Sequence, residues 1–429
     1  MTMQDLTQTT LAQIDKKRIR GIELGAESIY PAYDGLSILN LPGSISKWLG
    51  AGPLAHPALQ IPELDQLAQG VEQVVVLLVD AVSLHRFQRW LSSSAGRLNQ
   101  SAQGGLTATL TSIVPSTTSA ALTTLWTGRS PAEHGILGYE LFLREFGVIA
   151  NMITHSPAAF HSPPGLLYQA GFSPESFLPV STLGTHLASA GVQSHTFLHQ
   201  AISGSGLSQM HLPAVERHTF RGIADLWLNV RRLVNTPLEA PRYVWVYYGG
   251  VDWISHLVGP DSEDAEVTFK TFTDVLAEQF LDQVDTKIGG KTLFVMIADH
   301  GQLHTRKDPH YELQNHPNLA RRLQMVPTGE NRLAYLYPKP GQIDAIEEYI
   351  ERTWPGGFTP MPSSHALHNG LFGPGDPSPQ SLNRLGERIL VTHGDSYLWW
   401  APIENPLIGR HGGVSREEML VPLLAKKLA

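Results

Sequence analysis

Short apolar runs that end in a polar or glycine-rich turn recur along this chain, and they constrain its fold more than any other feature. These runs are rich in β-branched residues and cover residues 74–79, 243–248, 293–298 and 333–337. Helix-like stretches lie between and around them, at residues 84–91, 119–126, 182–190, 223–233 and 264–284. Such alternation predicts an α/β fold, with a mainly parallel central sheet and helices on both of its faces.

Proline and glycine set the expected domain organisation. Several prolines break the first 70 residues into short pieces, so residues 1–70 are predicted to wrap the edge of the sheet. Residues 71–429 then form the main domain. We expect loop or cap insertions near residues 140–240 and 305–390, which contain the two stretches richest in proline, glycine and serine.

Composition excludes several kinds of site and partner. The chain has no cysteine, so any metal must be held by His, Asp, Glu or hydroxyl ligands. Its net charge of -8 and its single short basic cluster, at residues 16–20, give no sign of a nucleic-acid surface. The N-terminus lacks an apolar signal region, and no apolar run is long enough to span a bilayer. A cytoplasmic protein with no membrane contact is therefore expected, of an oligomeric state that the sequence does not define.

Three of the predicted strands deliver acidic residues or histidines to their carboxyl ends. Residues 74–79 lead into Asp80, residues 243–248 are followed by Asp252 and His256, and residues 293–298 by Asp299 and His300. A single Asp at a strand end is usually a helix cap or a turn former. Three such ends, however, meet at one edge of a parallel sheet, which is where α/β proteins bind ligands.

The spacing of these residues suits metal binding. Asp252 and His256 are four apart, so one helical turn would place both on one face. Asp299 and His300 are adjacent, and we expect Gly301 to allow the sharp turn that aims both at one ion. A late histidine, His411, is flanked by glycines that would let the backbone approach a ligand closely. Carboxylates and neutral imidazoles are good ligands for Zn²⁺ and Mn²⁺.

A run of small and hydroxyl residues, at 115–128, predicts a loop that leads into a helix starting near Ser119. A phosphate at that helix start would meet free backbone N–H groups and the positive end of the helix dipole. The alternative is that Ser116, Thr117 and Thr118 serve only as N-caps.

Taken together, the motifs resemble the alkaline phosphatase superfamily, and within it the type I phosphodiesterase/nucleotide pyrophosphatase family. That family has an Asp after the first strand, a P-x-x-T segment closing in T-G, then D-x-x-x-H, D-H-G and a late H-G. The corresponding elements follow in the same order over residues 80–412: Asp80, Pro115–Thr118 with Thr127–Gly128, Asp252–His256, Asp299–Gly301 and His411–Gly412.

The resemblance implies an alkaline-phosphatase-like fold and the hydrolysis of phosphodiesters or nucleotide pyrophosphates through a phosphothreonine. Thr118 would be the nucleophile, with Thr117 as the alternative. Two divalent ions are implied, Zn²⁺ with Mn²⁺ as the alternative. One would be held by Asp252, His256 and His411, and the other by Asp80, Asp299, His300 and the oxygen of Thr118. The partner would be a small phosphorylated substrate.

Two departures leave the substrate class open. Ala81 replaces a common glycine, and Ala121 replaces the Asn that diesterase and phosphonate-hydrolase relatives carry three residues after the nucleophile. Asn151 or His155 could supply the missing donor. No Lys or Arg is near Thr118 in sequence, which favours diesters, unless a distant Arg242 or Arg410 folds into the site. A phosphomonoesterase, a phosphonate hydrolase and a non-catalytic relative that binds a phosphorylated ligand are the alternatives.

Overall fold

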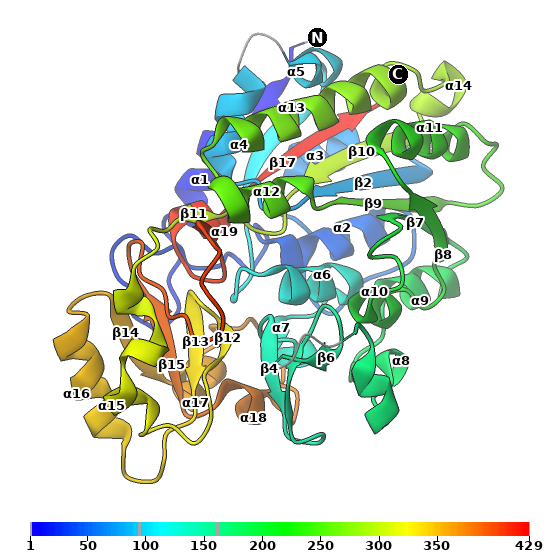
Figure 1. The fold of residues 1–429 in the computed structure, drawn as a ribbon. Helices are drawn as coiled ribbons and strands as arrows, with labels where there is room; N and C mark the ends of the chain where they lie inside the picture. Colours follow the sequence, from blue (N-terminus) through cyan, green and yellow to red (C-terminus); the bar gives the residue numbers. More distant parts are fainter. Residues whose placement is uncertain (1, 93–95, 159–162, 429) are drawn as a thin grey trace.

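A central sheet between two layers of helices organises the protein, whose computed structural model describes residues 2–92, 96–158 and 163–428 (Figure 1). Neighbouring strands of this sheet run parallel, except where β17 pairs with β3 and β10. The α/β fold with a mainly parallel sheet is thereby confirmed. In spatial order its strands are β1 (Gln4–Asp5), β3 (Leu106–Thr111), β17 (Leu420–Lys427), β10 (Thr292–Ile297), β2 (Gln73–Val79), β9 (Arg242–Tyr248), β7 (Gln193–His199) and β8 (Glu216–Phe220).

Helices cover both faces of the central sheet. On one face lie α4 (Leu84–Ser92), α11 (Ile223–Val234) and α13 (Glu263–Leu276), and on the other lie α2 (Leu41–Trp48) and α6 (Thr118–Thr127). None of the helices in the described residues combines the length and apolar character that crossing a bilayer requires. The other α-helices are α1 (Thr7–Ile14), α3 (Pro62–Leu67), α5 (Arg97–Ser101), α7 (Pro131–His134), α8 (Pro174–Phe177), α9 (Leu183–Ser189), α10 (Gly206–His211), α12 (Gly250–Val258), α14 (Thr286–Gly289), α15 (Pro317–Ala320), α16 (Ile343–Thr353), α17 (Ser363–His368), α18 (Ser381–Leu385) and α19 (Arg416–Met419).

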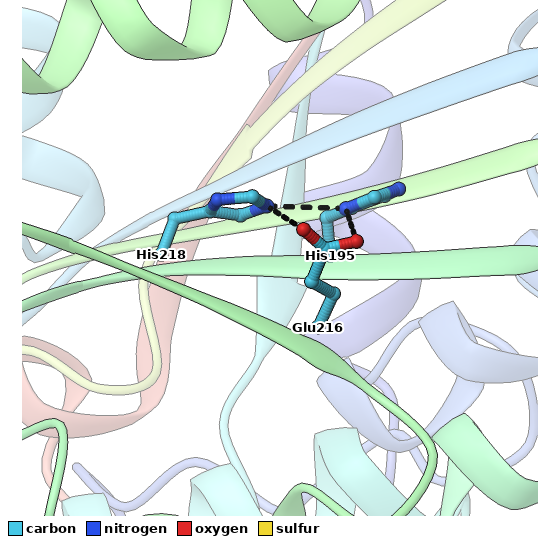
Figure 2. A group of neighbouring side chains, drawn as sticks. All are labelled: His195, Glu216 and His218. Atoms are coloured by element: carbon cyan, nitrogen blue, oxygen red, sulfur yellow. Dashed lines mark hydrogen bonds and ion pairs between the residues drawn. The ribbon is translucent and has the colours of Figure 1, made fainter.

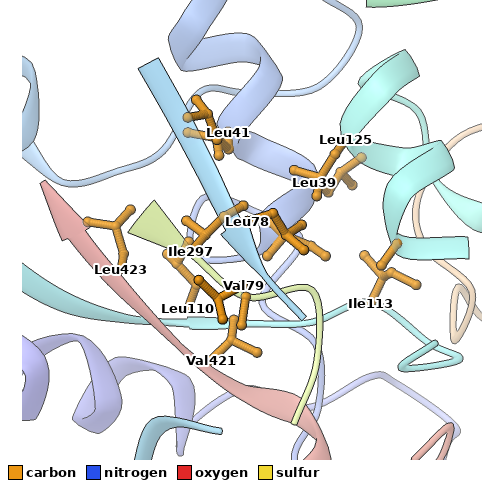
Figure 3. Close-up of a cluster of buried hydrophobic side chains, with 14 of the residues drawn as sticks. Leu39, Leu41, Leu78, Val79, Leu110, Ile113, Leu125, Ile297, Val421 and Leu423 are labelled. Carbon is orange, nitrogen blue, oxygen red and sulfur yellow. The ribbon is translucent and has the colours of Figure 1, made fainter. Parts of the chain in front are cut away.

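The core follows from the composition of the strands. Every residue of β2, β3 and β10 is buried, as expected for strands covered on both faces. Figure 3 shows Leu78 and Ile297 of the sheet among side chains from α2, α6 and the 3₁₀ turn η1 (Ile38–Asn40). Fully burying one such side chain contributes about 1.5–3 kcal/mol. This packing holds the start of α6 against the sheet.

A second, antiparallel sheet lies beside the first. It contains the run at residues 333–337, as β13, so our assignment of that run to the central sheet is wrong. This sheet covers a smaller core of its own, with α16 packed against it. In order, its strands are β14 (Phe358–Pro362), β15 (Arg388–Thr392), β13 (Leu333–Leu336), β12 (Thr328–Glu330), β4 (Glu140–Leu143), β5 (Val148–Asn151) and β6 (Ser156–Pro157), and a separate pair joins β11 (Leu303–His304) to β16 (Gly409–Arg410).

The register of the central strands brings three chain segments to one level. Val79 at the end of β2 pairs with Tyr248 at the end of β9, and Leu78 pairs with Ile297 at the end of β10. Because these strands are parallel, the segments that follow them emerge side by side at the carboxyl edge of the sheet. Asp80, helix α12 and Asp299 therefore lie at this edge, just after β2, β9 and β10.

Candidate active site

The loop between β3 and α6 gives three neighbouring hydroxyl groups three different surroundings. Ser116 donates from Oγ to the carbonyl of Gly413 at 2.8 Å, which ties the loop to the late glycine segment. The Thr117 side chain hydrogen-bonds to Glu330. Thr118 is the first residue of α6, and only its hydroxyl faces the Asp and His residues of the sheet edge. The geometry therefore separates Thr118 from the two hydroxyls before it.

Asp80, Asp299 and His300 surround the Thr118 hydroxyl. Thr118 Oγ1 is 3.1 Å from His300 Nε2 and 3.5 Å from Asp80 Oδ2. His300 Nε2 is also 3.5 Å from Asp80 Oδ1 and 3.5 Å from Asp299 Oδ2. Tyr247 donates its hydroxyl to Asp80 Oδ2 at 2.5 Å. These four sequence-predicted residues thus converge on one point, and Tyr247 adds a support that the sequence analysis missed.

Asp252, His256 and His411 form a second group beside the first. His256 Nε2 lies 3.3 Å and His411 Nε2 lies 3.9 Å from Asp252 Oδ1. The helix α12 places Asp252 and His256 one turn apart, as their spacing predicted. Gln302 donates from Nε2 to Asp252 Oδ1 at 2.5 Å and holds that carboxylate in place. The rings of His300 and His411 stack with centroids 3.9 Å apart, so the two groups share one site.

Backbone carbonyls orient the three site histidines in the same way. The Nδ1 atom of His256 lies 2.8 Å from the carbonyl of Gly409, that of His300 lies 3.0 Å from its neighbour Gly301, and that of His411 lies 3.1 Å from Ser116. A carbonyl can only accept, so each Nδ1 carries a proton, and each Nε2 is the nitrogen that faces the carboxylates and is placed to bind a metal ion. This tautomer arrangement is the usual support for histidines that bind metal.

The electrostatics of the site favour bound cations. Burial, together with the neighbouring carboxylates, holds the pKa of Asp80 well above its ordinary value and raises the pKa of Asp299 to about 7. Asp80 Oδ1 and Asp299 Oδ2 are buried without a hydrogen-bond partner. Burial alone would lower the pKa of His256, but the Asp252 carboxylate outweighs it and raises that pKa to about 9. Three carboxylates with free lone pairs and three inward imidazoles fit divalent metal ions.

Glycines allow the chain segments to meet this closely. A Cβ at position 301 would lie 1.9 Å from the carbonyl oxygen of Glu417, so Gly301 is needed for space. Gly301 does not have a positive φ, so the space it leaves for Glu417 explains this glycine better than a special backbone conformation does. At Gly412, φ is +109° and a Cβ would lie 2.4 Å from Glu330 Cβ. This glycine, next to His411, does bring the backbone close to a neighbour.

The two arginines that could have reached the site from elsewhere contact other groups. Arg242 donates to Gln73, at the opposite end of the strands, and the guanidinium of Arg410 lies over the ring of Tyr397 at 3.7 Å. Ala121 is fully buried in the core. The two ring nitrogens of His155 have no hydrogen-bond partner and both are buried. Among the described residues, the Thr118 hydroxyl is hydrogen-bonded to Asp80 and His300 and to no lysine or arginine.

An apolar cavity of about 70 Å³ opens beside Thr118. Trp245 and Tyr247 line one wall, and Leu122 and Trp126 of α6 line another. Trp253, which follows Asp252 on α12, is 69% exposed. Val251 and Ser255 are the buried residues of α12, whereas Asp252 and His256 are partly buried.

This fold and this site define a class of protein, the hydrolases of the alkaline phosphatase superfamily. The sequence model of the family described as type I phosphodiesterase / nucleotide pyrophosphatase matches residues 74–353, well over half of the chain. The chain belongs to this family. The resemblance seen in the sequence motifs is therefore confirmed.

Solved structures with a similar fold include two kinds of enzyme. Murine ectonucleotide pyrophosphatase / phosphodiesterase 5 has a TM-score of 0.61 and 15% identity, over 82% of this chain and 87% of that chain. Phosphonoacetate hydrolase from Sinorhizobium meliloti 1021, in complex with phosphonoformate, has a TM-score of 0.59 and 15% identity, over 84% and 91%. At this identity the likeness shows the shared fold. Curated protein sequences contain no match to the chain.

Proposed function

We propose that the protein hydrolyses phosphodiester or nucleotide pyrophosphate bonds through a phosphothreonine formed on Thr118, with two divalent metal ions. The observation that carries the proposal is the position of Thr118 Oγ1, at the start of α6 and 3.1–3.5 Å from His300 and Asp80. Thr117 becomes the weaker alternative, because its side chain is engaged by Glu330.

The proposed reaction has two halves. The Thr118 hydroxyl loses its proton as its oxygen attacks phosphorus, the Oγ1–P bond forms as the bond to the ester or anhydride oxygen breaks, and the leaving oxygen takes up a proton to depart as an alcohol or remains the oxygen of a departing phosphate. Water then attacks the phosphothreonine and releases the phosphorylated product with Thr118 restored. The first N–H groups of α6 have no acceptor within the helix and face the phosphoryl oxygens. The buried walls around Thr118 exclude bulk water from the first half.

The proposed ligand sets follow the two groups of side chains. Asp252, His256 and His411 would hold one ion, and Asp80, Asp299, His300 and Thr118 the other. When bound, the two ions supply the positive charge that lowers the pKa of the threonine hydroxyl and offsets the charge of the phosphoryl group. Zn²⁺ suits the mixed imidazole and carboxylate ligands, and Mn²⁺ is the alternative. Activity of the metal-free protein reloaded with each ion would separate them.

A preference for diesters over monoesters rests on what surrounds Thr118. A monoester dianion carries one more charge than a diester, and the arginines named as candidates, Arg242 and Arg410, contact other groups. The adjoining cavity is lined mostly by apolar side chains and suits the second ester arm of a diester.

The test compares kcat/KM for bis-p-nitrophenyl phosphate with that for p-nitrophenyl phosphate on one metal-loaded preparation. We expect a ratio above one. Phosphonoacetate is added to the panel, because the fold is shared with a phosphonoacetate hydrolase. A ratio well below one would point to a monoesterase, and turnover of phosphonoacetate alone to a phosphonate hydrolase. A protein that binds AMP without turnover of any of the three would be a binding relative.

The cytoplasmic location stays a prediction, which fractionation of the source cells would check.

A further inference from the structure

Two histidines and a glutamate meet at the edge of the central sheet, away from the candidate active site. His195 lies on β7, and Glu216 and His218 lie on β8, the last strand of the sheet. The two strands are parallel, with His195 paired to Glu216 and Phe197 paired to His218. Side chains at positions 195, 216 and 218 therefore project from one face. Figure 2 shows their polar ends converging on a common point. We call these three residues the edge triad.

The edge triad is separated from the active site by the sheet itself. Thr196 and Leu198 of β7 line the cavity beside Thr118. Successive side chains along a strand point to opposite faces, so His195 points away from that cavity. His195 also sits near the start of its strand, whereas the active site lies beyond the carboxyl ends. A ligand at the edge triad would thus have no contact with Thr118.

The distances within the edge triad match the edges of a coordination polyhedron. His195 Nδ1 is 3.1 Å from His218 Nε2 and 3.3 Å from Glu216 Oε2, and His218 Nε2 is 3.6 Å from Glu216 Oε1. Zn²⁺ binds His nitrogen and carboxylate oxygen at about 2.0–2.2 Å, so two ligands of a tetrahedral ion lie about 3.3–3.6 Å apart. All three separations are close to that length, although each histidine is nearest to a different oxygen of Glu216, and each of the three residues can offer one ligand atom.

The surroundings hold the two imidazoles in this orientation. The ring of His218 stacks on Phe197 with centroids 4.6 Å apart, and the rings of His195 and His218 lie within 24° of parallel. His195 is 8% exposed, and its other ring nitrogen, Nε2, is buried without a hydrogen-bond partner. The polar contacts of this ring among the described residues therefore all lie within the triad.

One side of the edge triad is open to solvent. The side chain of Glu216 is 65% exposed and that of His218 is 29% exposed. An ion can therefore enter from solvent and keep a water molecule as its fourth ligand. Two imidazole nitrogens and one carboxylate select a zinc-like transition metal over Mg²⁺ or Ca²⁺, which prefer oxygen ligands.

We propose that His195, Glu216 and His218 form a third divalent-metal site, for Zn²⁺ or a similar transition metal, that fastens the edge strand β8 to β7. The bound ion would link the two strands through side chains, in addition to their backbone hydrogen bonds. Its role would be to stabilise the sheet edge, since it is remote from the reacting groups. The alternative is a hydrogen bond between two histidines with a nearby glutamate and no affinity for metal.

Zinc binding by the intact protein tests the proposal. Metal-free protein is equilibrated with a buffered series of free Zn²⁺ concentrations, and bound zinc per chain is measured by mass spectrometry. We expect His218→Ala and Glu216→Gln each to bind one zinc per chain fewer than the unmodified protein at the concentration where the latter saturates. The control is His199→Ala, which removes a histidine at the end of β7 outside the triad, and it should bind as much zinc as the unmodified protein.

Two further readouts separate this site from the catalytic one. The zinc-dependent increase in Tm should be smaller in His218→Ala and Glu216→Gln than in His199→Ala. Phosphoesterase activity of all three metal-loaded variants should stay within about twofold of the unmodified protein, so a failure here leaves the proposed function untouched. Glu216→Gln preserves the shape of the side chain, and it guards against a folding defect in His218→Ala. Equal zinc content and an equal Tm increase in triad variants and control would overturn the proposal.

Discussion

Two groups of buried charges in this protein have nearly the same burial and opposite electrostatics. In the first, Arg332 and Glu418 are both fully buried and form a two-point ion pair, with N–O distances of 3.1 and 2.9 Å. Gly413 adds a backbone N–H to the same carboxylate at 2.9 Å. In the second, Asp80 and Asp299 are as deeply buried, and one oxygen of each has no partner.

The pKa values of the two groups record this difference. Burial would raise the pKa of Glu418, but Arg332 and the hydrogen bonds outweigh it and hold that pKa below its ordinary value. Burial and neighbouring carboxylates raise the pKa of Asp80 and of Asp299. One region contains its own counterion and serves stability. The other has no counterion for its carboxylates, so a bound cation would favour their charged form, as expected at a metal site.

The largest expected effect is the loss of activity in Thr118→Ala. The substitution removes the hydroxyl that faces the acidic cluster and leaves the helix start in place. We expect turnover to fall on the order of 10⁴-fold or more, because a covalent nucleophile is lost. Steady-state kinetics with bis-p-nitrophenyl phosphate measure the effect, while circular dichroism and metal content should stay unchanged. Near-normal activity here, with loss of activity in Thr117→Ala, would move the nucleophile by one residue.

Breaking the buried ion pair of Arg332 and Glu418 should instead lower the stability of the fold. Arg332→Ala leaves Glu418 buried and uncompensated, so we expect unfolding free energy to fall by about 3–5 kcal/mol. Urea unfolding followed by tryptophan fluorescence measures it. The matched control is Arg416→Ala, which removes the half-exposed pair with Asp15 and should cost less than about 1 kcal/mol. Similar losses in the two variants would mean that the buried pair has no special role.

Removal of one proposed metal ligand should empty one ion site. We expect Asp252→Ala and His411→Ala each to weaken binding of one ion by more than about 100-fold, since each loses one of three ligands. Metal per chain should fall by one relative to the unmodified protein under the same conditions. Asp264→Ala, at an exposed position on α13, is the control and should keep full occupancy. Unchanged metal content in both ligand variants would disprove the assignment.

Tyr247→Phe tests whether the acidic cluster depends on its hydrogen-bonded support. The ring stays, but Asp80 loses the hydroxyl that lies 2.5 Å away. Outer partners of this kind typically contribute 10- to 100-fold to metal affinity, so we expect a loss in about that range. Competition with a chromophoric chelator measures it. The control is Tyr248→Phe, which removes the hydroxyl of the next residue. The ring of Tyr248 stacks on Phe272, so this variant should bind metal normally.

The smallest effect concerns the acid stability that Glu418 provides. Its folded-state pKa is below the ordinary value of 4.5, so its stabilisation is complete above about pH 4.5 and is lost as pH falls through the folded pKa. Glu418→Gln should therefore lower stability at neutral pH and make the acid decline less steep, by at most about 1.4 kcal/mol per pH unit. Urea unfolding between pH 3 and 7 tests this. An unchanged slope would show that another carboxylate controls the decline.

Much of the central sheet could be read from local sequence. The runs that become β2, β9 and β10 are apolar, β-branched and close to their observed length. The strands β3 and β7 escaped notice, because Thr, Ser and His interrupt their apolar pattern. Residues 333–337 belong to a second sheet because they pair with β15, more than fifty residues away. No local sequence pattern indicates such a pairing.

The candidate site divides in the same way. Ligand types, their order and their spacing were visible in the sequence, because DWISH, DHG and RHGG are continuous segments that carry the reactive groups. Tyr247 and Gln302 lie next to these segments, yet their roles depend on which side chain each one meets. Nothing in the sequence marked Glu330, which reaches Thr117 from the second sheet.

The types, order and spacing of the candidate site residues can be seen in the chain alone, because a side chain and its neighbours in sequence are local properties. Tertiary structure alone decided which of three adjacent hydroxyls faces the carboxylates, and which buried acid receives an arginine and which is left without one. Those outcomes depend on contacts between residues such as Arg332 and Glu418, which are 86 positions apart. Charge compensation in a protein interior is set by distance in space, and only the folded chain fixes that distance.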